Sequence, residues 1–368
     1  MTDKIAYPVQ LVQPDGRRVH RAAYSELVAD VGTAELRALY EDMVVVRRVD
    51  GEATALQRQG QLGIWVPSLG QEAAQVGSAH AMAPDDYVFT SYREHGVAYC
   101  RGVEPAQWPR LWRGVALSCW NPDELGLTNP AIIVGAQGLH ATGYAMGAHF
   151  DGAEIATFAY FGDGATSQGD LSEALGFAAT FNAGVVFFCQ NNHWAISEPV
   201  TLQSPFPLAQ RASGFGIPGI RVDGNDALAV LAVTRSAARR AREGSGPTFV
   251  EAVTYRMGPH TTSDDPTRYR TGAELEVWRA RDPIDRLHRL LEREEGLDAE
   301  FLAAVNAKAE DTAAAFRAAT VTLPDPDPMQ LFEHVYTQDH PLIDEEREQF
   351  ARYLGTLSVP ETLSEARS

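Results

Sequence analysis

The stretch FGDGATSQGD, residues 161–170, decides how this chain folds. It sets one carboxylate, Asp163, between two glycines directly after the apolar run EIATFAYF (154–161), and the helix-like segment LSEALGFAATF (171–181) follows. Glycines between a buried strand and a helix let backbone N–H groups approach an anion closely. The pattern therefore predicts a strand, a ligand-binding turn and a helix.

The same alternation continues along the chain. The apolar runs VVFFCQ (185–190), GIRVD (219–223) and PTFVEAVTYR (247–256) are separated by segments of helical character, such as ALAVLAVTRSAARRARE (227–243). Near-continuous apolar strands separated by helices indicate βαβ units. The expected fold class is α/β, with a mostly parallel sheet, helices on both faces, and helical N- and C-terminal extensions.

Three further segments complete the expected organisation. A long helix is predicted over 33–60, and two short strands over YVFTSYREHG (87–96) and AIIV (131–134), the second followed by a glycine turn and a helix. From residue 272 the chain reads as helical, interrupted by the proline-rich link TLPDPDP. We expect an irregular N-terminal arm at 1–32, a ligand-binding α/β domain at 33–320 and a C-terminal helical extension at 321–368.

Composition excludes several classes of function. With 31 basic against 49 acidic residues and a net charge of −18, the chain is unsuited to neutralising nucleic-acid phosphates. Its lysines, Lys4 and Lys308, lie in no motif, which argues against Schiff-base and P-loop chemistry. Cys100, Cys119 and Cys189 form no C-x-x-C pair, and no apolar run approaches the ~20 residues of a membrane helix. We expect a cytoplasmic enzyme that binds neither nucleic acid nor membrane.

A second polar pair follows the strand that comes after the opening motif. The run VVFFCQ leads into Asn191 and Asn192, and 26 residues (165–190) separate Gly164 from Asn191. Because ligands bind at the carboxyl ends of parallel strands, Asp163 and Asn192 are expected to meet at one sheet edge. Their hard oxygen atoms suit Mg²⁺. A lone GDG or NN usually marks a turn, but their pairing after two buried strands favours a metal site.

A dinucleotide-binding fingerprint fits these residues less well. Starting at Gly162, that fingerprint requires glycine or alanine at position 167, where this chain has Ser167, and no suitable acidic residue follows. A nicotinamide-dependent dehydrogenase on a similar sheet is therefore the second hypothesis. A non-catalytic assembly protein with the same fold is the third.

The GDG motif followed at this interval by NN resembles the thiamine diphosphate-binding motif. Other segments agree: RQGQLGIWVPSLGQEAAQ, YREHG, IIVGAQ, QNNHWAIS, GIRVDGND and MGPHTTSDDPTRYR. From about residue 33 to about residue 340 the chain resembles the α subunit of the decarboxylating first component of 2-oxo acid dehydrogenase complexes. That family includes pyruvate, branched-chain 2-oxo acid and acetoin enzymes, and the resemblance implies a thiamine diphosphate-binding fold.

The resemblance implies roles for the residues of the opening motif. Asp163 and Asn192 would bind Mg²⁺, and the backbone carbonyl of Trp194 would be a third protein ligand. The turn after the strand would face the diphosphate of the cofactor through Gly162, Gly164 and Ala165.

Other positions match residues on the remaining sides of a cofactor site. Tyr92 and Arg93 would reach the diphosphate, for which a guanidinium fork is suited. His260 would be catalytic, on a loop that closes over the cofactor. Val134, with Ile132 nearby, matches the bulky residue that separates the two cofactor rings. The wall facing the substrate side chain is expected to consist of Ile64, Tyr92 and Val134.

The loop carrying His260 and two departures from the family pattern complete the site. Arg268 and Arg270 are expected to form salt bridges with Asp264 and Asp265 when the cofactor binds. Gln190 stands where some relatives carry an arginine for the phosphate. Thr261 stands where mammalian relatives carry a regulatory serine, so no control by a kinase is expected.

One essential group has no motif in this chain, namely the glutamate that engages the aminopyrimidine of thiamine diphosphate. The resemblance implies that a β subunit supplies it, within an α₂β₂ heterotetramer. The expected reaction is oxidative decarboxylation of a 2-oxo acid and acyl transfer to a lipoyl group of the acyltransferase component. The sequence leaves pyruvate and branched-chain acids open, with acetoin as a further alternative.

Overall fold

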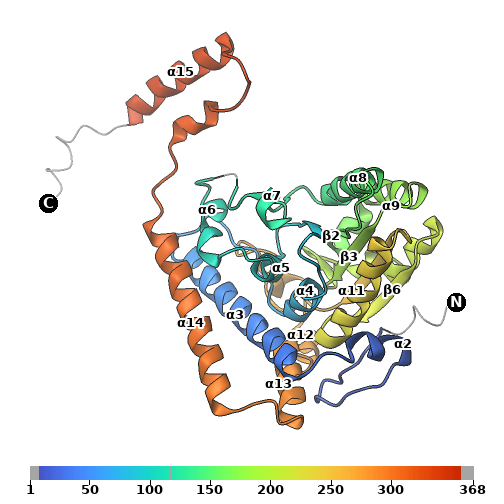
Figure 1. The fold of residues 1–368 in the computed structure, drawn as a ribbon. Coiled ribbons are helices and arrows are strands. Elements are labelled where there is room, and N and C mark those ends of the chain that lie inside the picture. The colour runs from blue at the N-terminus through green and yellow to red at the C-terminus, as the bar shows by residue number, and fades with distance from the viewer. Residues whose placement is uncertain (1–7, 117, 358–368) are drawn as a thin grey trace.

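The structure is a computed structural model that describes residues 8–116 and 118–357 (Figure 1). Its centre is a five-stranded sheet in the order β1-β2-β3-β7-β6, and every strand pairing in it is parallel. The strands are β1 (Tyr87–Phe89), β2 (Thr157–Gly162), β3 (Val185–Asn191), β6 (Gly219–Asp223) and β7 (Thr248–Val253), and a separate hairpin consists of β4 (Trp194–Ala195) and β5 (Glu198–Pro199).

Helices cover both faces of this sheet because its central strands are apolar on both sides. Phe158 and Tyr160 of β2 pack into one core with α4 and α11, whereas Ala159 and Phe161 pack into another with α8 and α9. Successive side chains of a strand point to opposite faces, so a strand buried on both sides needs apolar residues throughout. The predicted α/β class with a parallel sheet is confirmed.

The helices arrange themselves around the sheet in chain order. The α-helices are α2 (Ala22–Ser25), α3 (Thr33–Arg58), α4 (Glu72–Ala79), α5 (His95–Cys100), α6 (Pro109–Trp112), α7 (Pro122–Leu125), α8 (Ala136–Phe150), α9 (Gly169–Thr180), α10 (Val200–Gln203), α11 (Ala227–Arg242), α12 (Gly272–Arg279), α13 (Pro283–Arg293), α14 (Ala299–Thr322) and α15 (Pro341–Leu357). The long helix predicted from residue 33 is confirmed as α3, which lies against α14 outside the sheet (Figure 1).

One predicted strand is wrong. The run AIIV at 131–134 forms no strand, and Gly135, with a φ of 93°, turns the chain into α8. Beside β1, the place of a further strand is taken by a single parallel bridge between Val88 and Leu127. The apolar character of 131–134 therefore has another cause, since Ile132 and Ile133 are 62% and 76% exposed.

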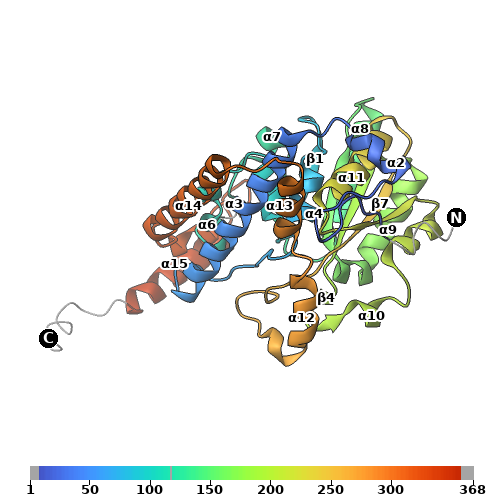
Figure 2. The same cartoon turned by 90° about the horizontal axis from the view of Figure 1, so that it is seen from below.

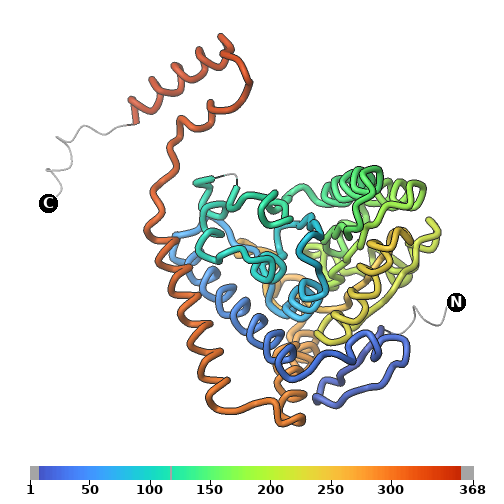
Figure 3. Tube along the Cα trace, in the orientation of Figure 1, coloured from blue at the N-terminus to red at the C-terminus, as the bar shows by residue number. Residues whose placement is uncertain are grey.

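The N-terminal segment lies against the sheet and α13 (Figure 3). Val9 bridges β6 in parallel at Val222, next to the edge of the sheet. The buried carboxylate of Asp226 accepts hydrogen bonds from the backbone N–H groups of Leu11 and Val12, at 2.7 and 2.6 Å. These contacts attach the segment to the start of α11 without a regular strand.

The C-terminal part follows the proline-rich link. There α15 projects from the remainder of the molecule, as two perpendicular views agree, and none of its residues is buried (Figures 1 and 2). Within the described parts of the chain, no helix combines the length and the apolar character that crossing a bilayer requires.

Two glycines test how closely the elements pack. A Cβ at Gly219 would lie 2.0 Å from the carbonyl oxygen of Ala209, whereas a Cβ at Gly51, within α3, would meet nothing within 4 Å. We expect Gly219→Ala to lower the free energy of unfolding by about 1–3 kcal/mol through overpacking. Gly51→Ala should raise it by about 0.5–1 kcal/mol. Chemical denaturation of the purified chain measures both, and an unchanged Gly219→Ala variant would contradict the prediction.

Candidate functional site

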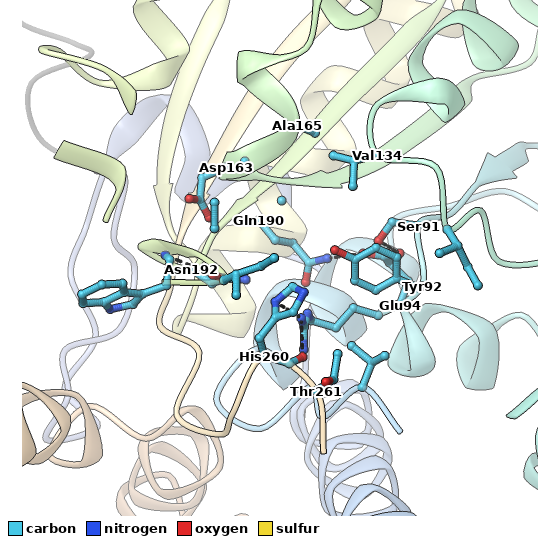
Figure 4. Close-up of a pocket in the computed structure, with 18 of the residues that line it drawn as sticks. Ser91, Tyr92, Glu94, Val134, Asp163, Ala165, Gln190, Asn192, His260 and Thr261 are labelled. Atoms are coloured by element: carbon cyan, nitrogen blue, oxygen red, sulfur yellow. Dashed lines mark hydrogen bonds between the residues drawn. The ribbon is translucent and has the colours of Figure 1, made fainter. Parts of the chain in front are cut away.

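A cavity of about 450 Å³ opens at the carboxyl ends of β2 and β3 (Figure 4). This is the edge at which parallel α/β sheets bind ligands. All the residues selected from the sequence line this cavity, namely Ile64, Tyr92, Arg93, Ile132, Val134, Gly162, Asp163, Gly164, Ala165, Asn192, Trp194 and His260.

Strand register brings the two polar motifs together. Gly162 of β2 pairs with Gln190 of β3, so Asp163 and Asn192 follow directly at the same edge. In Figure 4 both lie on one side of the cavity. Gly164 has a packing reason to be glycine, because a Cβ there would lie 2.8 Å from the Cβ of Ala195. Close contact with the following hairpin, rather than backbone strain, restricts this position.

Asp163 is a buried carboxylate without a cationic partner. Its Oδ2 accepts a hydrogen bond from Nε2 of Gln203 at 2.9 Å, and no ion pair within residues 8–116 and 118–357 involves it. Burial raises the pKa of Asp163 to about 6. A buried carboxylate in this condition favours a bound cation, which would supply the missing positive charge.

The oxygens next to Asp163 are of the same hard type. Asn192 donates from Nδ2 to Oε1 of Gln71 at 3.1 Å, which fixes the amide so that Oδ1 is the acceptor. The carbonyl of Trp194 accepts from Arg256 at 2.7 Å and retains a second lone pair. Gln71 also leaves its buried Nε2 without a partner at the cavity wall. Carboxylate, amide and carbonyl oxygens together fit a divalent metal such as Mg²⁺.

Positive charge gathers beneath His260. The guanidinium groups of Arg93 and Arg256 each contact Nδ1 of His260 at 3.2 Å, and neither forms an ion pair with a carboxylate of the described residues. Burial, together with the neighbouring Arg256, lowers the pKa of Arg93 to about 10. Two buried guanidiniums without counter-ions fit an anionic ligand.

The same contacts determine the tautomer of His260. A guanidinium can only donate hydrogen bonds, so Nδ1 must accept and the ring proton lies on Nε2. Burial, followed by Arg93 and Arg256, lowers the pKa of His260 to about 3. The imidazole is therefore neutral at physiological pH and offers an N–H donor.

The loop that carries His260 is held by contacts within itself. Asp264 accepts from the backbone N–H of His260 at 2.7 Å and from the hydroxyl of Tyr269. Arg270 donates to the backbone carbonyls of residues 256–258. Asp265 caps the short helix at 266–268. In this structure these partners hold the loop in place of the expected salt bridges.

A second buried carboxylate lies on the opposite side of the cavity from Asp163 (Figure 4). Glu94 accepts hydrogen bonds from Oγ of Ser91 at 2.8 Å and from Nε2 of Gln190 at 2.7 Å. Gln190 in turn accepts from Gln75 at 3.1 Å. Burial raises the pKa of Glu94. Both oxygens of Glu94 thus have donors from this chain.

Apolar side chains form the remaining wall. Val134 lies across the cavity from His260, and the ring of Tyr92 meets the ring of His260 edge-on, with centroids 6.1 Å apart (Figure 4). Ile132 and Ile196 at the rim are largely exposed. The cavity is consequently apolar at its mouth and charged within.

Sequence reasoning missed three residues of the site. Arg256 contacts Trp194 and His260, Gln203 binds Asp163, and Gln71 binds Asn192. Arg256 stands four residues before His260, at the end of an expected strand, and that position was a usable signal. The two glutamines lie in loops or short helices without any motif, so nothing in the sequence singled them out.

The fold and the cavity define an α/β protein with a polar ligand site at the carboxyl edge of a parallel sheet. Residues 40–326 match the family model described as dehydrogenase E1 component. The chain belongs to this family, which confirms the resemblance and implies thiamine diphosphate as the cofactor.

Characterised relatives agree with the family model. The chain is 46% identical to the 3-methyl-2-oxobutanoate dehydrogenase subunit alpha of Mycobacterium tuberculosis (strain ATCC 25618 / H37Rv), over 95% of this chain and 94% of the relative. It is 41% identical to the pyruvate dehydrogenase E1 component subunit alpha of Staphylococcus aureus (strain N315), over 77% of this chain and 76% of the relative.

The buried neutral imidazole of His260 predicts a pH effect on stability. Its pKa of about 3 lies below the ordinary value near 6.5, so the unfolded chain binds the extra proton first as the pH falls. This histidine therefore contributes a loss of stability that begins below about pH 6.5. We expect His260→Asn to lose on the order of 1 kcal/mol less stability than the unsubstituted chain between about pH 7 and pH 5.

Denaturant unfolding at the two pH values measures this difference. His20→Asn, at an exposed histidine, is the control and should follow the unsubstituted chain. Equal pH dependence in all three proteins would contradict a neutral, buried His260.

Proposed function

We propose that this chain is the α subunit of a thiamine diphosphate-dependent dehydrogenase of branched-chain 2-oxo acids. The reaction is oxidative decarboxylation of the 2-oxo acid and transfer of the acyl group to a lipoyl group of an acyltransferase component. The observation that carries this proposal is the meeting of opposite needs in one cavity. Asp163 lacks a cation, and Arg93 and Arg256 lack an anion.

A metal diphosphate satisfies both needs at once. Mg²⁺ would be held by the carboxylate of Asp163, Oδ1 of Asn192 and the carbonyl of Trp194, with phosphate oxygens completing its shell. The guanidinium of Arg93 and the hydroxyl of Tyr92 would contact the diphosphate. The backbone N–H groups of the turn would do so as well, at Gly162, Gly164 and Ala165.

His260 has a proton-holding role in this proposal. When bound, thiamine diphosphate supplies an electron sink for the electrons released as CO₂ leaves. The proton on Nε2 of His260 is available to an oxygen of the substrate, because Nδ1 is occupied by the two arginines. Asp264 keeps the imidazole in position by accepting from the backbone N–H of His260 at 2.7 Å.

The apolar wall supplies positioning and substrate choice. Val134, with Ile132 beside it, would separate the two rings of the cofactor. Ile64, Tyr92 and Val134 would face the substrate side chain. A branched-chain acid is favoured by the relative named for 3-methyl-2-oxobutanoate, which is similar over 95% of this chain, against 77% for the relative named for pyruvate.

A β subunit would complete the site. The lining carboxylates are Asp163 and Glu94, and both oxygens of Glu94 already accept from Ser91 and Gln190. The glutamate for the aminopyrimidine must then come from another chain. Exposed apolar residues at the rim, Ile132, Ile133 and Ile196, suit a covering partner in an α₂β₂ assembly. The cofactor-binding domain would span 33–320, followed by the helical extension at 321–368.

The metal site gives a direct test. Asp163→Asn keeps the size of the side chain but removes its charge, so Mg²⁺-dependent thiamine diphosphate binding should weaken by at least about 100-fold. Asp170→Asn, at an exposed aspartate of α9, is the matched control and should bind normally. Isothermal titration of each chain assembled with its β partner measures the affinity. Equal affinity in both variants would remove Asp163 from the metal site.

Substrate choice and the divided site are tested together. The assay is 2-oxo acid-dependent reduction of an artificial electron acceptor, with the chain alone and then with its β partner. We expect activity only with the partner, and kcat/KM at least about 10-fold higher for 3-methyl-2-oxobutanoate than for pyruvate. A preference for pyruvate would change the substrate but leave the subunit assignment. Activity from the chain alone would refute the divided site.

A further inference from the structure

A cluster of three potential metal ligands lies away from the cofactor cavity. Asp42 of α3, His80 directly after α4 and Cys100 at the end of α5 bring one ligand atom each within 4.8 Å of one another. Nε2 of His80 lies 2.7 Å from Oδ2 of Asp42, and Sγ of Cys100 lies 3.7 Å from the same oxygen. Among the residues that the structure describes, no other set of three histidine, cysteine or acidic side chains meets this condition.

The residue types select a borderline-soft divalent cation. Imidazole nitrogen, thiolate sulfur and carboxylate oxygen are the three ligand types of zinc, whereas Mg²⁺ prefers oxygen alone. A carboxylate and a thiolate together balance the two positive charges of the metal. The thiol proton of Cys100 would leave to solvent when the metal–sulfur bond forms. We propose that Asp42, His80 and Cys100 form a Zn²⁺ site separate from the cofactor cavity.

The distances already approach those of a zinc site. Tetrahedral zinc, with bonds of about 2.0–2.3 Å, holds neighbouring ligand atoms roughly 3.3–3.6 Å apart. The separation of oxygen and sulfur, 3.7 Å, is close to this range. The separation of oxygen and nitrogen, 2.7 Å, is that of a hydrogen bond and widens by a small side-chain rotation once the proton between them is replaced. Partial exposure of Asp42 and His80 allows water to be the fourth ligand.

The place of the site in the fold gives it a structural effect. Gln71, just before α4, and Glu94, just before α5, line the cofactor cavity. His80 and Cys100 lie at the other ends of these two helices. A metal held there would tie both helices to α3 and thereby stabilise the segments that line the cavity.

Cobalt titration of the purified full-length chain tests the proposal. Co²⁺ is added to metal-free protein in the presence of excess Mg²⁺, and the near-ultraviolet absorption is recorded. We expect one equivalent of Co²⁺ to produce a thiolate-to-cobalt charge-transfer band, and Zn²⁺ to abolish it by displacement. Zn²⁺ should also raise the melting temperature of the unsubstituted chain. Absence of the band would overturn the proposal.

Two pairs of variants make the result specific. Cys100→Ser should lose both the band and the Zn²⁺-dependent rise in melting temperature, and Cys119→Ser, a buried cysteine elsewhere, should keep both. His80→Asn should weaken Co²⁺ binding at least about 10-fold, whereas His149→Asn, on the exposed face of α8, should not. A band that persists in Cys100→Ser, or that disappears in Cys119→Ser, would refute the site.

Discussion

The pocket depends on one constraint, which is that charged groups are buried at the carboxyl edge of the sheet without partners of opposite charge from this chain. Asp163 is almost fully buried beside one amide donor, and Arg93 and Arg256 share a neutral histidine as their common acceptor. Isolated buried charges cost several kcal/mol each. The packed faces of the sheet provide the stability that makes this tolerable, and a ligand combining metal and phosphate would remove the penalty.

Neutral side chains hold these charges in place. Gln203 donates to Asp163, Gln190 donates to Glu94, and Gln71 accepts from Asn192. An amide fixes the orientation of a charged group by hydrogen bonding but does not neutralise it. The site is therefore preorganised without being electrostatically satisfied, which is the condition under which charged ligands bind with specificity.

The structure also leaves one side of the site unfinished. The mouth of the cavity is apolar and exposed, and the second carboxylate in its wall, Glu94, is fully engaged with donors of its own chain. By contrast, the interior ends of α4 and α5 are fixed in the core. A rigid inner half and an open apolar rim are consistent with a chain that provides the diphosphate half of an active site and receives the remainder from a partner.

The sequence by itself determined the fold class and the positions of Asp163 and Asn192, because apolar strands followed by GDG and NN are local patterns with a fixed period. The tertiary structure decided what local patterns do not encode. Arg256, Gln203 and Gln71 join the site through contacts between segments far apart in the chain. The run at 131–134 has the composition of a strand, yet it lies at the rim of the cavity, because β1 offers it no ladder of hydrogen bonds. Composition records which residues are apolar, but only packing decides what they lie against.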